Sequence, residues 1–141
     1  MEEAHIMAKK IRQRACTRMK PKTVPDSVKR ELSRKAEMLV KDHLAPLHVK
    51  PAPNEPKFNY IVDILTKWRG RYFYFIAKYA TPEAEPTKSF FEYGFARLEF
   101  TGDGRFDLAY FRHTGKWWPL FTDLSLDQAL ESVRSDGLFM P

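Results

Sequence analysis

The spacing of apolar residues along this chain changes from a helical period to an alternating one. Between Val28 and Leu44 they recur every three or four residues, which predicts a helix with one apolar face. Asp26 or Ser27 is expected to cap its first amides. Pro46 is expected to end the helix near 43–45, because proline has no backbone N–H and clashes with the preceding turn. The apolar face consists of Val28, Leu32, Ala36, Leu39, Val40 and Leu44.

From Phe58 onward the pattern alternates with a period of two, after a proline-rich connector at 46–56. This period predicts strands, bounded by turn signals rich in glycine. The second strand is aromatic on both faces, so it is expected inside the sheet and covered on both sides. Pro119 marks the last strand as an edge, because it cannot donate a ladder hydrogen bond. The expected strands cover 58–68, 71–79, 90–100, 105–113 and 117–121.

A short helix closes the chain. Ser125 and Gln128 have the spacing of a capping box, and Asp136-Gly137 is expected to end the helix in a left-handed conformation. The inward positions are Leu126, Ala129, Leu130 and Val133. The expected fold is therefore α+β, with both helices against one face of a curled antiparallel sheet of about five strands. Its predicted core contains Val62, Ile64, Phe73, Phe75, Phe95, Phe106, Leu108, Tyr110, Leu32, Leu39 and Leu130.

The N-terminal residues differ from the rest of the chain in their charge. Residues 1–35 contain 11 of the 24 Lys and Arg but only 4 of the 18 acidic residues, and the remainder of the chain is almost neutral. Residues 1–22 also have too few apolar side chains to fold alone, so we expect a flexible basic arm there and a single α+β domain at 23–141. A basic arm on a neutral body suggests an electrostatic tether to an anionic partner. The alternatives are a solubilising or artefactual tail and a transit-type targeting signal.

Composition narrows the function classes. No apolar stretch is long enough to span a bilayer, and no apolar segment follows the basic N-terminus as it would in a secretory signal. We therefore expect no membrane association. Cys16 is the single cysteine, which is consistent with a reducing cytoplasm. The four histidines do not have ligand spacing, and no nucleotide-binding glycine loop or nucleophile elbow occurs. No metal, no cofactor and no catalytic residue are predicted.

Several stretches together resemble a bacterial family classed as a domain of unknown function. The stretches are FEYGFAR (91–97), GRFDL (104–108), RHTGKWW (112–118) and LSLDQAL (124–130). The resemblance covers roughly 26–141 and leaves out the basic arm. It implies a leading helix, a strand meander with a Gly-Lys-Trp turn, and a short closing helix, in a cytoplasmic stand-alone domain. It implies no activity and therefore no catalytic residue.

Two clusters are candidate binding sites. The turn at 112–118 could clamp a base or a phosphate; alternatively one indole faces the core, the other covers a helix, and the cations are solvated. The arm could contact phosphates through its cations. The candidate residues are Lys9, Lys10, Arg12, Arg14, Arg18, Arg112, His113, Lys116 and Trp117.

The resulting hypothesis is a non-enzymatic binding module whose partner is nucleic acid. A protein-interaction or homodimerisation domain is the alternative. A small enzyme comes third, and would require His113 to converge with Asp107 or Glu92. The outer face of the sheet separates these hypotheses. A charged and aromatic face would favour nucleic acid, and a large flat apolar face would favour a dimer.

Overall fold

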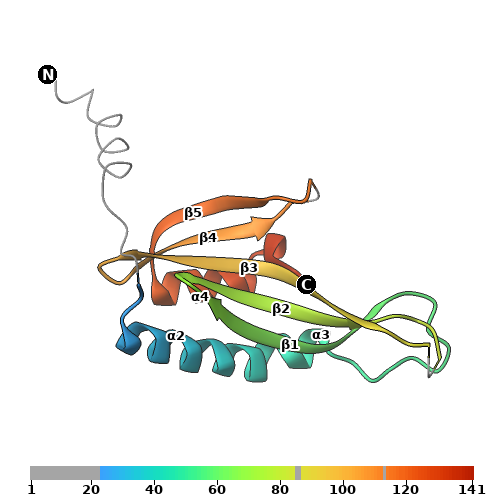
Figure 1. The fold of residues 1–141 in the computed structure, drawn as a ribbon. Coiled ribbons are helices and arrows are strands. Elements are labelled where there is room, and N and C mark those ends of the chain that lie inside the picture. The colour runs from blue at the N-terminus through green and yellow to red at the C-terminus, as the bar shows by residue number, and fades with distance from the viewer. Residues whose placement is uncertain (1–22, 85–86, 113) are drawn as a thin grey trace, which may run out of the picture.

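A five-stranded antiparallel sheet with the order β1-β2-β3-β4-β5 forms the centre of the protein (Figure 1). The computed structural model describes residues 23–84, 87–112 and 114–141. Each strand pairs with the next along the chain, so the sheet is a meander with β1 and β5 at its edges. This confirms the predicted fold class. The strands are β1 Tyr60–Arg69, β2 Tyr72–Ala80, β3 Phe90–Gly102, β4 Arg105–Phe111 and β5 Trp117–Ser125.

Some predicted strand ends were wrong by a few residues. Phe58 lies outside β1 and is 80% exposed, because it has no partner strand to pack beside. β5 continues beyond Phe121 to Ser125, since it stays paired with β4 as far as Arg105. A bulge in β3 places Gly94 opposite Ile76 and buries both Phe95 and Ala96.

The helices pack on one face of the sheet, as predicted (Figure 1). α2 spans Asp26–Leu39 and α4 spans Leu126–Ser135, where the predicted capping box is present. The main core consists of Leu32, Ala36, Leu44, Ala129, Leu130 and Val133 from the helices, against Ile64, Phe73, Phe75, Phe95, Leu98, Phe106 and Leu108 from the sheet. Of the predicted core residues, Val62, Leu39 and Tyr110 are only half-buried.

Polar contacts also fix α2. The Trp68 indole Nε1 donates a hydrogen bond to Ser33 Oγ at 3.0 Å, which ties α2 to β1. Lys35 Nζ lies 2.9 Å from Asp127 Oδ1 and so links α2 to α4; this hydrogen bond raises the pKa of Lys35. α2 is therefore held to both the sheet and the second helix.

The prediction that Pro46 ends the first helix was wrong. A π-helical turn, η1 (Val40–Leu44), follows α2, and α3 (Ala45–His48) continues the helix past the proline. In the wide turn the Ala45 N–H bonds to Val40 O, five residues back. Pro46 thus stands in a new first turn, where no N–H is needed.

Two predicted helix ends also differ. α2 begins after Pro25 and has no side-chain cap. Instead, the Lys29 N–H bonds to Pro25 O at 3.1 Å. Gly137 is not left-handed: Asp136 is extended with φ −87°, and its side chain accepts a hydrogen bond from the Leu138 N–H to start the 3-10 turn η2 (Gly137–Phe139). That turn buries Phe139 beneath the sheet, edge-on to Tyr110.

Candidate functional site

The face of the sheet opposite the helices, called here the open face, is covered by no element in the part of the chain that the structure describes. Alternation places Phe73 and Phe75 of β2 toward the helices, so Tyr72 and Tyr74 stand on the open face. The prediction that β2 is an interior strand is confirmed. Its second face is covered by side chains of neighbouring strands, not by a second layer.

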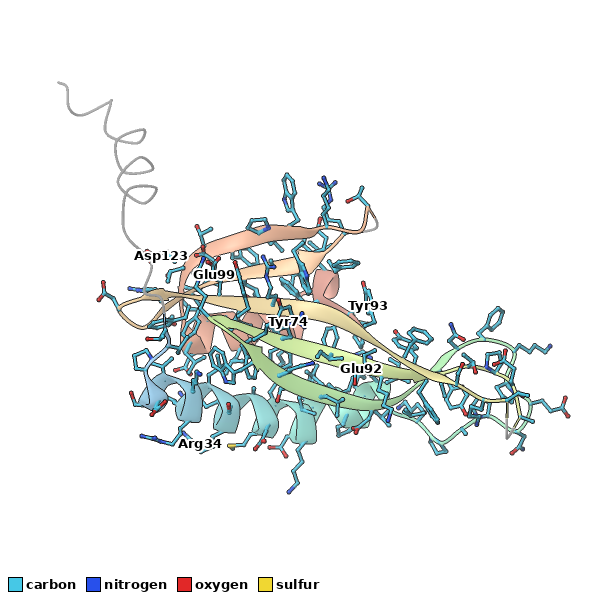
Figure 2. The ribbon with its side chains drawn as sticks, viewed as in Figure 1. Arg34, Tyr74, Glu92, Tyr93, Glu99 and Asp123 are labelled. Carbon is cyan, nitrogen blue, oxygen red and sulfur yellow. The ribbon has the colours of Figure 1, made fainter. Side chains whose placement is uncertain are left out.

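A cleft of about 470 Å³ lies on this face. It crosses the sheet, because each of the five strands contributes a lining residue. Figure 2 shows Tyr74, Glu92 and Tyr93 together on the middle strands. The lining residues are Lys67, Arg69, Tyr74, Ile76, Glu92, Tyr93, Gly94, Phe111 and Trp117.

Trp117 forms one wall of the cleft, close against the backbone of β3. A Cβ added at Gly94 would lie 3.2 Å from Trp117 Cζ2, so only glycine leaves this space. The indole meets Phe111 edge-on with ring centroids 5.3 Å apart, and Tyr74 at 5.7 Å. These contacts hold the ring in place before any ligand arrives, which lowers the entropic cost of binding.

Arg97 lies beside Trp117 and is partly desolvated. Its guanidinium carbon is 4.4 Å from the centroid of Tyr72 and 5.1 Å from that of Trp117. Its Nε is buried and has no hydrogen-bond partner. A buried donor left unpaired costs stability, so Arg97 keeps one unsatisfied N–H beside the cleft while its charge lies over the two aromatic rings.

The charged side chains that line the cleft are not neutralised by one another. Lys67, Arg69 and Glu92 form no ion pair with any described residue. Nearby, by contrast, Arg71 Nε is 2.8 Å from Glu99 Oε2, and that hydrogen bond raises the pKa of Arg71. The cleft therefore offers free cations on β1 and a free carboxylate on β3.

Of the predicted site residues that the structure describes, one lines the cleft. That residue is Trp117; Lys116 is exposed at the hairpin tip. Trp118 is 50% exposed, points away from Trp117, and has the Arg112 guanidinium 4.7 Å above its ring. Neither indole is in the core or packed against it, so the alternative in which one indole faces the core was wrong. His113, Lys9, Lys10, Arg12, Arg14 and Arg18 lie outside the described residues.

Sequence reasoning did not identify most of the cleft. Lys67 and Arg69 of β1 and Tyr74 of β2 belong to no sequence motif. The sequence feature that pointed to the cleft was the aromatic pattern of β2, which has aromatic residues on both faces. The second of these faces was expected to be covered. Asp107 is used structurally: its Oδ1 accepts a hydrogen bond from the Asp123 N–H at 3.0 Å.

Two further observations bear on the type of site. Across the described ranges, no three His, Cys, Asp or Glu side chains cluster as metal ligands would. None of the helices in those ranges is both long and apolar enough to cross a membrane.

Comparison with known proteins gives a family. The chain matches the model of the family described as "Domain of unknown function (DUF3024)" over residues 3–141, which confirms the resemblance found in the sequence. The match extends further toward the N-terminus than the expected 26–141 and includes most of the basic arm. Searches of curated proteins and of solved structures find no match.

Proposed function

This chain belongs to the DUF3024 family, and we propose that it binds single-stranded nucleic acid along the open face of its sheet. The observation that carries the proposal is the cleft in which Trp117 and Tyr74 stand beside unpaired Lys67 and Arg69. Exposed aromatic rings with neighbouring cations are the combination that single strands require, since bases stack on rings and phosphates contact cations.

The charge distribution suggests how a bound nucleic-acid strand would cross the sheet. Lys67 and Arg69 are on the edge strand β1, whereas Trp117 is on the opposite edge strand β5. Phosphates would lie over β1, with bases turned toward β3 and β5. Arg97 adds a positive group beside the indole. Single strands fit better than duplexes, because bases in a duplex are already stacked on one another.

The basic arm would extend this electrostatic surface. Its cations as far as residue 22 are Lys9, Lys10, Arg12, Arg14, Arg18, Lys20 and Lys22. Contacts of this kind add affinity without sequence preference and weaken as salt rises. The arm would then hold the chain near nucleic acid while the cleft engages unstacked bases.

The adjacent indoles provide a matched test. Fluorescence anisotropy with a labelled single-stranded oligonucleotide at ~50 mM salt should show binding of the full chain. Trp117→Ala should weaken binding by about 1–3 kcal/mol, the usual value of one stacked base. Trp118→Ala removes the same side chain from the other side of β5 and should change affinity little.

The cations predict a second readout. If Lys67 and Arg69 both contact phosphate, replacing both by Ala should reduce the slope of log Kd against log salt by about 1.4 for a single strand. No binding at tens of micromolar protein would refute the proposal, as would equal losses for the two tryptophan variants.

A protein-interaction domain is the second candidate. Aromatic side chains are exposed where β1 begins, β2 ends and β3 begins: Phe58 at 80%, Phe90 at 52% and Phe91 at 42%. Exposed aromatics of this kind are enriched at interfaces. Sedimentation analysis that finds a dimer dissociated by Phe90→Ser, without oligonucleotide binding, would support this candidate instead.

A further inference from the structure

Glu92 is the one acidic residue lining a cleft that otherwise suits an anionic ligand. It is paired in register with Lys78 on β2, yet the two form no ion pair. The Lys78 ammonium lies over the Phe90 ring, 5.1 Å from its centroid. The Glu92 carboxylate is therefore free, although a cation stands on the neighbouring strand.

The position of Glu92 places it beside the bases rather than the phosphates. Glu92 and Gly94 are two residues apart on β3 and share a face, so they are about 7 Å apart along the strand. The Cβ position of Gly94 lies against the Cζ2–Cη2 edge of the Trp117 ring. Lys67 and Arg69 stand on β1, on the other side of β2. A base stacked on Trp117 would thus have its edge toward Glu92 and its phosphate toward β1.

The chemistry of a carboxylate restricts which base edge it can accept. An ionised carboxylate has two acceptor oxygens and no donor. The Watson–Crick edge of guanine carries two adjacent donors, N1–H and N2–H. Adenine and cytosine present one amino donor beside an acceptor nitrogen, and uracil or thymine presents one N–H between two carbonyls. Only guanine can donate two hydrogen bonds to one carboxylate.

We infer that Glu92 selects guanine in the cleft by accepting hydrogen bonds from N1–H and N2–H of a base stacked on Trp117. The inference rests on the proposed function and adds a base specificity to it. A pair of hydrogen bonds of this kind favours the correct base over the others by about 5- to 150-fold in affinity.

The test uses oligothymidines roughly nine nucleotides long with one varied central base. With the full chain, central guanine should bind on the order of tenfold tighter than central adenine, cytosine or thymine. Central inosine keeps N1–H but lacks the N2 amino group, so its affinity should fall between guanine and thymine. Central 7-deazaguanine keeps both donors and should bind as guanine does.

Glu92→Gln keeps the size of the side chain but replaces one acceptor by a donor, so it should abolish the preference of guanine over inosine. Glu92 is exposed, and an unchanged melting temperature would show that the variant folds. Glu55→Gln in the connector removes the same charge away from the cleft and should keep the preference.

The outcomes separate the two proposals. Equal affinity for all central bases, together with a loss on Trp117→Ala, would overturn the role of Glu92 and leave single-strand binding intact. A guanine preference that survives Glu92→Gln would also overturn it. No binding to any of the oligonucleotides would overturn the proposed function itself.

Discussion

Gly94→Ala tests the closest contact in the cleft. The added Cβ would lie 3.2 Å from Trp117 Cζ2 and 3.4 Å from Cη2, whereas carbon atoms are comfortable at about 3.5–4.0 Å. The indole must therefore retreat by about 0.3–0.8 Å. It would do so against the rings of Tyr74 and Phe111, which meet it edge-on.

Two opposing effects act on stability. Replacing glycine in a strand gains about 0.5–1 kcal/mol of backbone entropy, and the crowded ring offsets it, so the free energy of unfolding should change by less than about 1 kcal/mol. Binding should respond more clearly. A displaced indole stacks less well on a base, and loss of about 0.5–1 kcal/mol would raise the Kd two- to fivefold.

Three measurements check this prediction: urea unfolding, oligonucleotide anisotropy, and the indole N–H resonance of Trp117 identified with Trp117→Phe. Gly137→Ala is the control, since no atom lies within 4 Å of its Cβ position and its φ is not left-handed. Unchanged Trp117 resonance and affinity in Gly94→Ala would show that the indole does not lie over β3.

Further predictions concern the fold and the arm. Leu32→Ala should cost about 3–4 kcal/mol in urea unfolding because the side chain is fully buried, and half-buried Leu39→Ala about half as much; the reverse order would mean that α2 is rotated. Ser125→Ala should lower the free energy of unfolding by about 1 kcal/mol, since Ser125 Oγ accepts a hydrogen bond from the Gln128 N–H. An unchanged urea midpoint would show that this helix cap does not contribute to stability. Burial, followed by the nearby charges of His43 and Lys50, lowers the pKa of His48 below 6.5, so its contribution to stability is present above pH 6.5 and is lost as the pH falls below that value. In His48→Gln the unfolding midpoint should therefore depend less on pH between about 7.5 and 5.5. An equally steep loss of stability in the variant would exclude His48 as the cause. Deleting residues 1–22 should leave the melting temperature within a few degrees and flatten the salt dependence of binding, whereas a large drop in stability would place the arm in the fold.

Much of the fold was predictable because its signals are local. Turn glycines and a period of two determine where each strand starts and which side chains share a face, and this produced the correct meander. The capping box at Ser125 is equally local. Pro46 shows what local signals cannot predict. A proline is known to destabilise a helix interior, but whether the helix ends or widens into a π turn depends on what the next turn packs against. Here Leu44 and Val49 contact the core, which favours continuing the helix.

The candidate site was less predictable. The sequence indicated Trp117 and a basic arm, but it assigned Arg112 and Lys116 to the same cluster as the indole. Alternation of neighbouring residues, together with the Arg112–Trp118 contact, separates them from the cleft. Lys67 and Arg69 carried no motif, because a residue in a sheet acquires its neighbours from strands that are distant in sequence.

By itself, then, the amino-acid sequence determined the elements, their order and the segregation of charge, since these follow from local periodicity and composition. Only the tertiary structure decided which side chains from different strands would meet on the face of the sheet that the helices leave uncovered. There Tyr74 and Trp117 come together, and Gly94 receives the indole. The physical reason is that burial is shared between elements: one layer of helices removes one face of the sheet from water, and the strands' alternation turns the remaining aromatic and charged side chains toward the other.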